Sequence, residues 1–223
     1  MANSGKQQLL AFLLIMVVLF LTPKYMEYIA PGLIMMSVIT NSYGNVVGSF
    51  FNAKIQRHIE ELLVSPMTEA SIVIGYLAGG IIRGLFVDAV VSFIALFFTE
   101  LNIKHPLLML IVIIMTAGVF SLAGLLNAIF AKKFDDIAVI PSFVLAPLTY
   151  LGGVFYTVSL LPDFWQTISR FNPILYMVNP MRYSVLGVSD IEIRDGLLMI
   201  FVFFILLLFS SIYLLKKGIG IRD

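Results

Sequence analysis

The feature that most constrains this chain is a set of long apolar stretches, the clearest of which runs from Leu197 to Leu215 without a charged residue. About 20 apolar residues in a helix are needed to cross the hydrocarbon core of a bilayer. Only 12% of the 223 residues are charged, whereas 60% are hydrophobic and the mean hydropathy is +1.02. A soluble domain carries about 25% charged residues. The composition therefore predicts an all-α membrane protein, because helices satisfy their backbone polar groups within lipid.

Six apolar stretches predict six transmembrane helices in one membrane domain covering residues 1–223. They lie at about residues 8–22, 29–53, 71–99, 107–131, 137–156 and 197–215. The first is slightly short, but Thr22-Pro23-Lys24 follows it instead of the small-x-small pattern that signal peptidase requires. We therefore expect an uncleaved span whose upstream end is incomplete.

Basic residues predict that both termini lie in the cytoplasm. With six spans the termini share one side, and the basic residues divide eight against five between the two sides, Arg83 within a span excepted. The side of the termini holds Lys6, Lys54, Arg57, Lys132, Lys133, Lys216, Lys217 and Arg222. The other side holds Lys24, Lys104, Arg170, Arg182 and Arg194.

Several classes of function lack the residues that they need. A net charge of +1 offers no electrostatic attraction for nucleic acid. Cysteine is absent and the two histidines lie in different polar segments, so no metal site and no thiol nucleophile are expected. The sequence contains neither G-x-x-x-x-G-K-[ST] nor G-x-S-x-G. No catalytic residue is predicted, and any ATP-driven work would need another polypeptide.

The polar segment 54–66 predicts a short amphipathic helix between the second and third spans. Its apolar side chains fall at helical spacing, at Ile55, Ile59, Leu62 and Leu63, and Pro66 ends the helix. A helix of this kind either lies on lipid or contacts a protein partner. Glu60 and Glu61 disfavour anionic lipid, but the pattern alone leaves both alternatives open.

Glycine pairs and two charges mark the second and third spans. Gly44/Gly48, Gly75/Gly79 and Gly80/Gly84 each form G-x-x-x-G, which allows close helix packing within one chain or between two copies.

Arg83 and Asp88 form a candidate intramembrane polar site, because charges within a span are costly and often functional. We place Arg83 near the cytoplasmic interface. Five positions apart, the two do not share a helix face well. Polar partners on other helices and a substrate site or proton relay both remain open.

The stretch of about 157–196 is the most unusual part of the chain. Its aromatic residues alternate with prolines, which predict short helices that dip into the membrane or lie flat on it. The residues concerned are Phe164, Trp165, Phe171, Tyr176 and Tyr183, with Pro162, Pro173 and Pro180. They are either an aromatic belt or a gate at the exit of a pathway.

From about Ile29 onward the sequence resembles the membrane subunit (permease) of ABC-2 type exporters, in particular its bacterial inner-membrane branch. The runs Ile-Glu-Glu-Leu-Leu-Val-Ser-Pro at 59–66, Phe-Asp-Asp-Ile at 134–137 and Leu-Thr-Tyr-Leu-Gly-Gly-Val-Phe-Tyr at 148–156 carry the resemblance. The family signature, whose residues are expected to be structural, is met at Leu145, Leu148, Leu151, Gly152, Val154, Leu161, Pro162, Pro173, Ile174, Tyr176 and Arg182.

The resemblance implies a specific arrangement. Such permeases have six spans, pair as dimers in the lipid of the inner membrane, and dock separate ATPase subunits that hold ATP and Mg. The helix between the second and third spans would be the coupling helix, with Arg57, Glu60, Glu61 and Pro66 at the ATPase contact. Short re-entrant helices would precede the last span. The chain itself would bind no cofactor. It departs from the family in having only about eight residues before the first span, where an amphipathic helix is usual.

The function expected is the transmembrane half of an ATP-driven exporter for a hydrophobic or amphipathic cargo, such as a drug, a lipid-linked molecule or a glycolipid. Two alternatives remain. One is a stand-alone secondary transporter that uses Asp88 as a proton carrier. The other is a membrane scaffold or assembly factor without transport activity.

Overall fold

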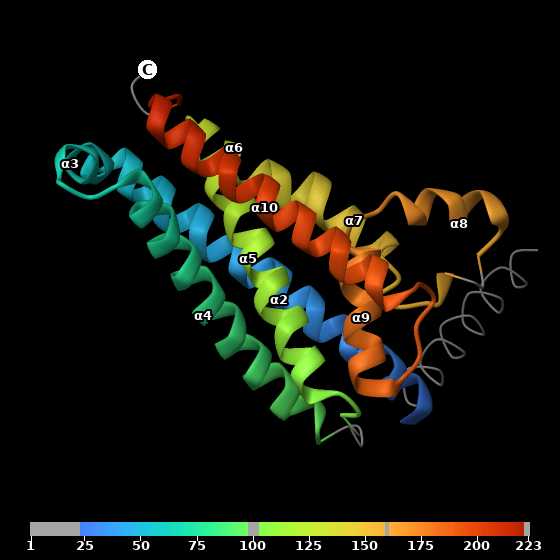
Figure 1. The fold of residues 1–223 in the computed structure, drawn as a ribbon. Coiled ribbons are helices and arrows are strands. Elements are labelled where there is room, and N and C mark those ends of the chain that lie inside the picture. Colours follow the sequence, from blue (N-terminus) through green and yellow to red (C-terminus); the bar gives the residue numbers. More distant parts are fainter. Residues whose placement is uncertain (1–22, 98–102, 159–160, 221–223) are drawn as a thin grey trace, which may run out of the picture.

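The structure is a computed structural model that describes residues 23–97, 103–158 and 161–220 (Figure 1). The expected first span, about 8–22, lies outside these residues. The described part is helical throughout and contains no strand. Its elements are α2 (Pro23–Ile55), α3 (His58–Val64), α4 (Glu69–Ala95), α5 (Pro106–Phe130), α6 (Phe134–Ile140), the π-helical segment η1 (Pro141–Leu145), α7 (Ala146–Leu151), α8 (Asp163–Arg170), α9 (Leu175–Leu186) and α10 (Ile193–Lys217).

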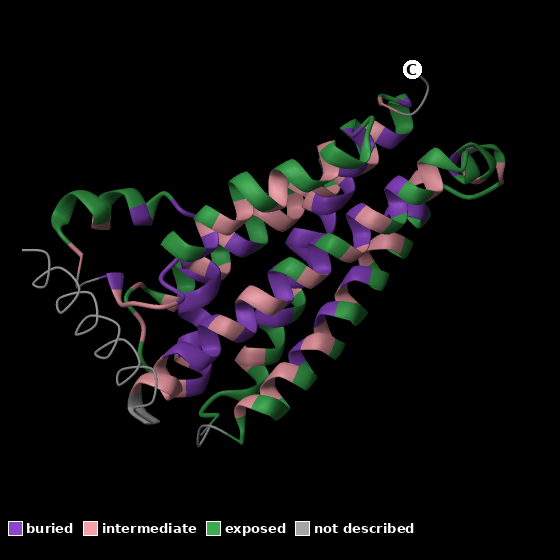
Figure 2. Ribbon diagram, turned by 180° about the vertical axis from the view of Figure 1, so that it is seen from behind, coloured by how far each residue is buried: buried purple, intermediate pink, exposed green. Residues whose placement is uncertain are grey.

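The helices α2 and α5 form the centre of the bundle. They pack most extensively against each other, α4 lies against both, and α9 and α10 cover the remaining side of α5. The core is aliphatic and aromatic, with Val38, Tyr43, Phe50, Leu122 and Leu125 at its middle. Figure 2 shows that burial concentrates between the helices, while the outward faces of the long helices are exposed. Those outward faces of α4 and α10 are largely apolar, as lipid contact requires.

Four of the helical segments are long and apolar enough to cross a membrane, namely Glu69–Ala95, Pro106–Phe130, Phe134–Leu151 and Ile193–Lys217. They correspond to the third to sixth expected spans. The second expected span, 29–53, is helical over the whole longer range of α2, whose 33 residues exceed the length that a bilayer requires. The helix α2 is not among the four apolar helices named above, because its sequence contains many polar residues, including Asn41, Asn45 and Asn52.

The fifth span begins and ends earlier than its apolar pattern indicates. The helix covers Phe134–Leu151 instead of 137–156, and it contains the π-helical turn Pro141–Leu145. Gly152 terminates it, and Gly153 adopts a positive φ of 75° that turns the chain away. Few contacts join this helix to the rest of the bundle beyond α5, and only Thr149 among its residues is fully buried, although one side is half-buried against the core.

The glycines of the three G-x-x-x-G pairs differ in whether they lie at a helix contact. A Cβ added at Gly80 would lie 2.0 Å from Ser121 Oγ, and one at Gly84 would lie 2.3 Å from Ser42 Oγ, so these two glycines face the junction of α4 with α5 and α2. At Gly44, Gly48 and Gly75 no atom lies within 4 Å of an added Cβ.

A close approach of two helix backbones involves Gly124 of α5, which belongs to none of the three motifs. A Cβ there would lie 2.6 Å from the carbonyl oxygen of Tyr43 in α2. This helix crossing therefore depends on a glycine that its spacing does not reveal.

The bundle has two distinct ends. The helix α3, the end of α5, the start of α6 and the end of α10 lie together at what we call the α3 end (Figure 1). The helices α8 and α9 lie toward the other end, called the α8 end. Pro162 precedes α8 and Pro173 lies between the two short helices, as expected, but Pro180 lies inside α9 and does not break it.

Candidate functional site

The expected coupling helix is shorter than its amphipathic pattern and begins after an elbow. The helix α2 continues to Ile55, Arg57 takes a left-handed conformation with φ of 62°, and α3 covers His58–Val64. This correction has a local reason, because the left-handed residue ends one helix and redirects the chain into the next. Ile55 consequently belongs to α2 and is 50% exposed, not part of the buried face of α3.

The face of α3 that meets the bundle is held by Ile59, which is fully buried, and by half-buried Leu62; the side chain of Leu63 lies outside the described part. Glu60 and Glu61 are exposed on the opposite side. The helix ends at Val64, two residues before Pro66. Both acids are therefore presented outward on a helix of two turns, at the tip of the bundle (Figure 1).

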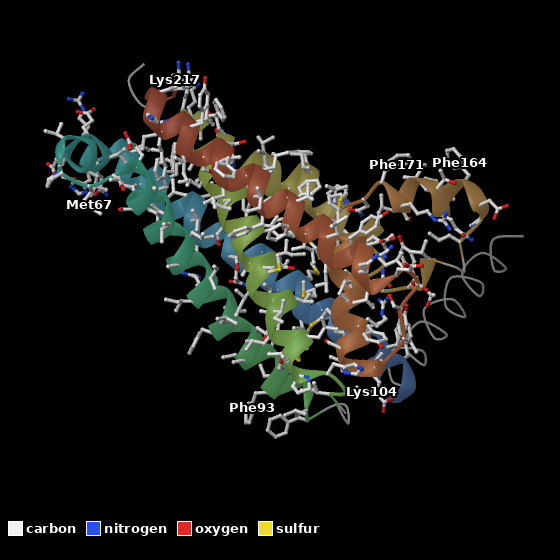
Figure 3. All side chains as sticks on the ribbon, in the orientation of Figure 1. Met67, Phe93, Lys104, Phe164, Phe171 and Lys217 are labelled. Carbon is white, nitrogen blue, oxygen red and sulfur yellow. The ribbon has the colours of Figure 1, made fainter. Side chains whose placement is uncertain are left out.

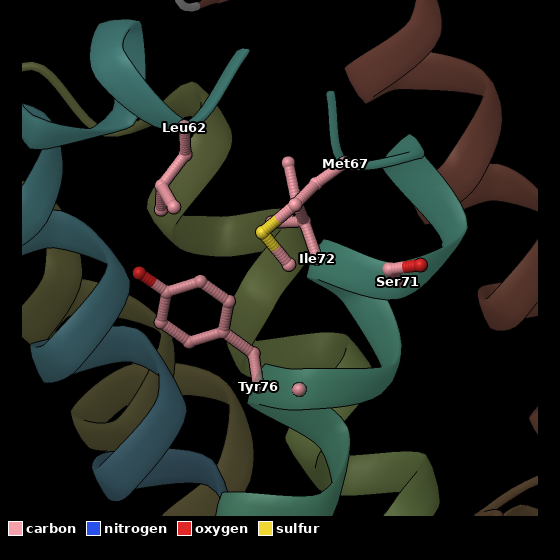
Figure 4. A pocket seen from close by; sticks show the side chains of 6 residues that line it. Leu62, Met67, Ser71, Ile72 and Tyr76 are labelled. Carbon is pink, nitrogen blue, oxygen red and sulfur yellow. The ribbon is translucent and has the colours of Figure 1, made fainter. Parts of the chain in front are cut away.

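A pocket of about 270 Å³ lies between α3 and the first turns of α4 (Figure 4). Its lining is mostly apolar and includes Leu62, Met67, Ile72 and Tyr76. Figure 4 shows the Met67 side chain reaching toward the space between Leu62 and Tyr76. Because α3 makes few contacts with α4, its firm attachment is to α2.

The outward side of α2, which we call the polar face, is unlike the outward sides of α4 and α10. It consists of small and polar residues that are exposed or half-buried, namely Ser37, Thr40, Asn41, Gly44, Asn45, Gly48, Ser49 and Asn52. Thr40 and Asn41 donate to carbonyl groups one turn earlier in the same helix. A surface of this kind suits water or a protein partner better than lipid tails.

Arg83 lies beside the polar face. It lies about 21 Å along α4 from Glu69, at 1.5 Å per residue, and so in the middle of the helix. Its place near the cytoplasmic interface stays a prediction. Its Nη1 donates to Asn45 Oδ1 at 3.3 Å. The structure thus gives Arg83 a polar partner on another helix.

Asp88 does not meet Arg83, and no ion pair joins them. Its side chain is 7% exposed and accepts a hydrogen bond from Ser92 Oγ at 3.4 Å. Within the described residues no basic group lies at ion-pair distance from Asp88. The two charges of the candidate polar site are therefore separate features.

The signature residues gather where the Phe134–Leu151 helix joins α9. Gly152 packs against Ile174, where an added Cβ would lie 2.7 Å from the Ile174 side chain. The amide of Asn172, just before Pro173, donates to the carbonyl oxygen of Leu148 at 2.6 Å. Leu145 and Leu148 pack on the core, whereas Leu151 is 39% exposed.

The remaining signature residues make packing and hydrogen-bond contacts at the α8 end. Val154 is buried against Gly32 of α2. The Leu161 carbonyl accepts from Gln166 of α8, whose first residue follows Pro162. Tyr176 donates its hydroxyl to the Arg170 carbonyl at 2.9 Å.

Arg182 is the largest fully buried side chain of the structure, at 1% exposure. Its guanidinium donates to the Gly153 carbonyl, lies 3.8 Å from the Asp190 carboxylate and stacks 4.2 Å from the centre of the Tyr28 ring. These contacts tie α9 to α2, to the turn after Leu151 and to the segment before α10. The Asp190 carboxylate and the Tyr28 ring offset the buried charge and Nη2 is hydrogen-bonded, whereas Nε and Nη1 have no hydrogen-bond partner among the described residues.

Helix α8 carries its aromatic residues on the outside. Phe164 and Phe171 are 68% and 83% exposed, and both project outward from the short helix (Figure 3). Buried Ser169 and half-buried Gln166 face the body of the protein. An amphipathic helix with its apolar side exposed is typical of a membrane interface.

Comparison with known proteins agrees with this architecture. The family model for ABC-2 type transporters matches residues 5–186. The chain belongs to the ABC-2 type transporter family. It is 52% identical over 201 residues to the inner membrane transport permease YadH of Escherichia coli, an alignment that covers 89% of this chain and 78% of that protein.

More distant relatives of this ABC-2 type transport permease include nodulation protein J of Rhizobium leguminosarum bv. viciae, 24% identical over 181 residues, or 80% of this chain and 70% of that protein. Nodulation protein J of Sinorhizobium fredii is 23% identical over 194 residues, covering 86% and 74% of the two chains. The family predicted from the sequence is thus confirmed.

Two parts of the site were missed in the sequence. The polar face of α2 is hidden there because its Asn, Ser and Thr residues interrupt an otherwise apolar stretch, and a helical projection of 37–52 would have aligned them. Lys54 was counted only as a basic residue, although its ammonium contacts the end of α5. Only the fold brings that partner close.

Proposed function

We propose that this permease is the transmembrane subunit of an ATP-binding-cassette exporter, driven by a separate ATPase chain that holds ATP and Mg. The observation that carries the proposal is α3, a short helix that presents Glu60 and Glu61 outward behind an elbow at Arg57. Exposed carboxylates suit a basic groove on a protein partner. Membership in the family supports the same partnership.

We place the chain in the bacterial inner membrane, in keeping with its similarity to an inner membrane permease. The α3 end would face the cytoplasm together with both termini, as the excess of basic residues on that side favours. Six spans and re-entrant helices at the α8 end remain part of this proposal. Helix α8 would then lie at the outer surface, with Phe164 and Phe171 among the lipid headgroups.

A second copy of the permease would complete the translocation path. The polar face of α2 and one side of the Phe134–Leu151 helix are surfaces that the described part of the chain leaves exposed. Pairing two polar faces around an axis gives a water-accessible route bounded by protein instead of lipid. ATP binding would draw the two α3 helices together and rock the protomers apart at the other end.

The cargo proposed is hydrophobic or amphipathic, of drug, lipid-linked or glycolipid type. Asn41 and Asn45 of the polar face, with Arg83 beside it, would add polar groups to the proposed path. Such groups suit the hydroxyl or anionic head of an amphiphile, whose apolar part would contact lipid-facing surfaces.

The test is affinity purification of the tagged permease from its own membranes in mild detergent. We expect a co-purifying ATP-binding subunit with vanadate-sensitive ATPase activity. The charge reversal Glu61→Arg should reduce its recovery about tenfold or more, the loss that one buried charged contact can cause. The matched control is Asp163→Arg, which reverses an exposed acid at the α8 end and should leave recovery unchanged.

One observation supports an alternative. Asp88 is buried without a basic partner in the described part of the chain, as a proton carrier would be. A permease that elutes alone and transports in ATP-free vesicles under a proton gradient, but not after Asp88→Asn, would replace the exporter with a secondary transporter. Tolerance of both Glu61→Arg and Asp88→Asn would point to a scaffold.

A further inference from the structure

Lys54, in the last turn of α2, reaches across to the end of another helix. Its Nζ donates to the carbonyl oxygens of Ile129 at 2.6 Å, Ala131 at 2.8 Å and Ala128 at 3.4 Å. The last carbonyls of a helix lack intrahelical donors and carry its negative pole. Helix α5 has no basic residue in its own last turn. The cap of α5 is therefore supplied by α2.

Lys54 lies shortly before the elbow that leads from α2 into α3. Arg57, the left-handed elbow, follows three residues later, and α3 begins directly after it. Buried Ile59 packs α3 onto α2, whereas the 270 Å³ pocket separates α3 from α4 (Figure 4). Packed atoms transmit a displacement, and α3 packs more extensively on α2 than on α4. A push on α3 consequently enters the last turns of α2, where Lys54 lies.

Three further contacts join α2, α5 and α6. Asn127 of α5 donates its amide to Tyr43 Oη of α2 at 2.7 Å and to the carbonyl of Ile137 in α6 at 3.4 Å. Phe51 of α2 meets Phe134 of α6 edge-to-face at 5.1 Å. The end of α2, the end of α5 and the start of the Phe134–Leu151 helix thus form one connected layer.

We propose that Lys54 is the positioning residue that carries movement of α3 into α5 and the Phe134–Leu151 helix. The inference rests on the proposed function, in which an ATPase displaces α3. A residue that only stabilised the end of α5 would affect the amount of folded protein. A transmitting residue decides in addition whether the Phe134–Leu151 helix follows α3.

The experiment uses the absence of cysteine in the chain. A spin label at Val64→Cys reports the separation of the two α3 helices in the dimer, and a label at Val139→Cys reports that of the two Phe134–Leu151 helices. Both side chains are exposed, at 89% and 49%. Distances are measured by pulsed electron paramagnetic resonance in the complex with its ATPase, with and without ATP and vanadate.

In the parent protein we expect ATP and vanadate to change both distances. Lys54→Met keeps the apolar stem of the side chain but removes its donors. In this variant the change at position 64 should persist while that at position 139 falls below about half, since the connecting contact is lost. Lys54→Arg, which retains charge and donors, should restore the change. Lys132→Met, which removes an exposed lysine at the same end, is the matched control.

A full change at position 139 in Lys54→Met would overturn the inference while leaving the exporter intact. An absent change at position 64 in the parent protein would instead overturn the proposed function and the inference with it. If Lys54→Met fails to assemble with the ATPase, Lys54→Gln, whose shorter neutral side chain cannot span the three carbonyls, is measured in its place and the same two distances decide.

Discussion

Replacing Gly124 by alanine tests whether the crossing of α2 and α5 holds the bundle together. An added Cβ would lie 2.6 Å from the carbonyl oxygen and 3.3 Å from the amide nitrogen of two α2 residues, Tyr43 and Val47. Both obstacles are backbone atoms, so no side-chain rotation relieves them. The two helices must separate along the most extensive contact of the fold.

The magnitude follows from two opposing terms. Overpacking costs about 1–3 kcal/mol, and the upper half applies here because the obstacle is backbone. Alanine regains up to about 1 kcal/mol through helix propensity. The matched control, Gly75→Ala in α4, gains the helix propensity of alanine without the cost of overpacking, since no atom lies within 4 Å of its added Cβ. The two variants should therefore differ by about 2–3 kcal/mol in the free energy of unfolding.

The assay is thermal unfolding of the detergent-solubilised permease at a fixed scan rate, for the parent and both variants. At about 2–4 °C per kcal/mol for a chain of this size, Gly124→Ala should unfold several degrees below Gly75→Ala. Equal midpoints for the two would refute the crossing geometry, whereas losses in both would show that glycine itself, and not its neighbour, is what matters.

Two predictions concern the α8 end. Arg182→Met should destabilise the protein by about 1–3 kcal/mol, because it leaves the buried Gly153 carbonyl without its donor. Arg194→Met, whose ion pairs are exposed, should change the thermal midpoint little. A similar midpoint for both variants would refute a structural role for Arg182. Trp165, the single tryptophan of the chain, should be quenched in vesicles more by phospholipids brominated near the headgroup than by aqueous iodide, because we propose that α8 lies at the interface. Stronger quenching by iodide would place α8 in water.

The sequence predicted the parts of the fold that depend on local hydrophobicity. The spans at 71–99, 107–131 and 197–215 correspond to α4, α5 and α10, because a lipid-facing helix must be apolar over its whole length. The end of the fifth span was placed five residues late, since Gly152 and Gly153 stop a helix that hydropathy alone would continue. The amphipathic helix expected over 54–66 was likewise too long, because the left-handed backbone of Arg57 ends one helix before α3 begins.

The candidate site divides in a similar way. The exposed acids Glu60 and Glu61 follow from the amphipathic pattern, and Pro66 predicts the end of the helix to within two residues of Val64. The partners of Arg83, Asp88 and Arg182 do not, because each is set by which residue of another helix lies opposite, and Asn45 lies 38 positions from Arg83. Lys54 and the end of α5 are separated by 75 positions.

What the sequence determined by itself is that the chain is a helical membrane protein of the ABC-2 type, since composition, apolar length and signature residues are properties of the chain read in order. Only the tertiary structure decided which glycines permit contact, which side of α2 stays polar and outward, and which helix supplies the cap of α5. These depend on the rotation of each helix about its axis. That rotation is set by the packing of all helices together, because no segment alone contains the atoms that select it.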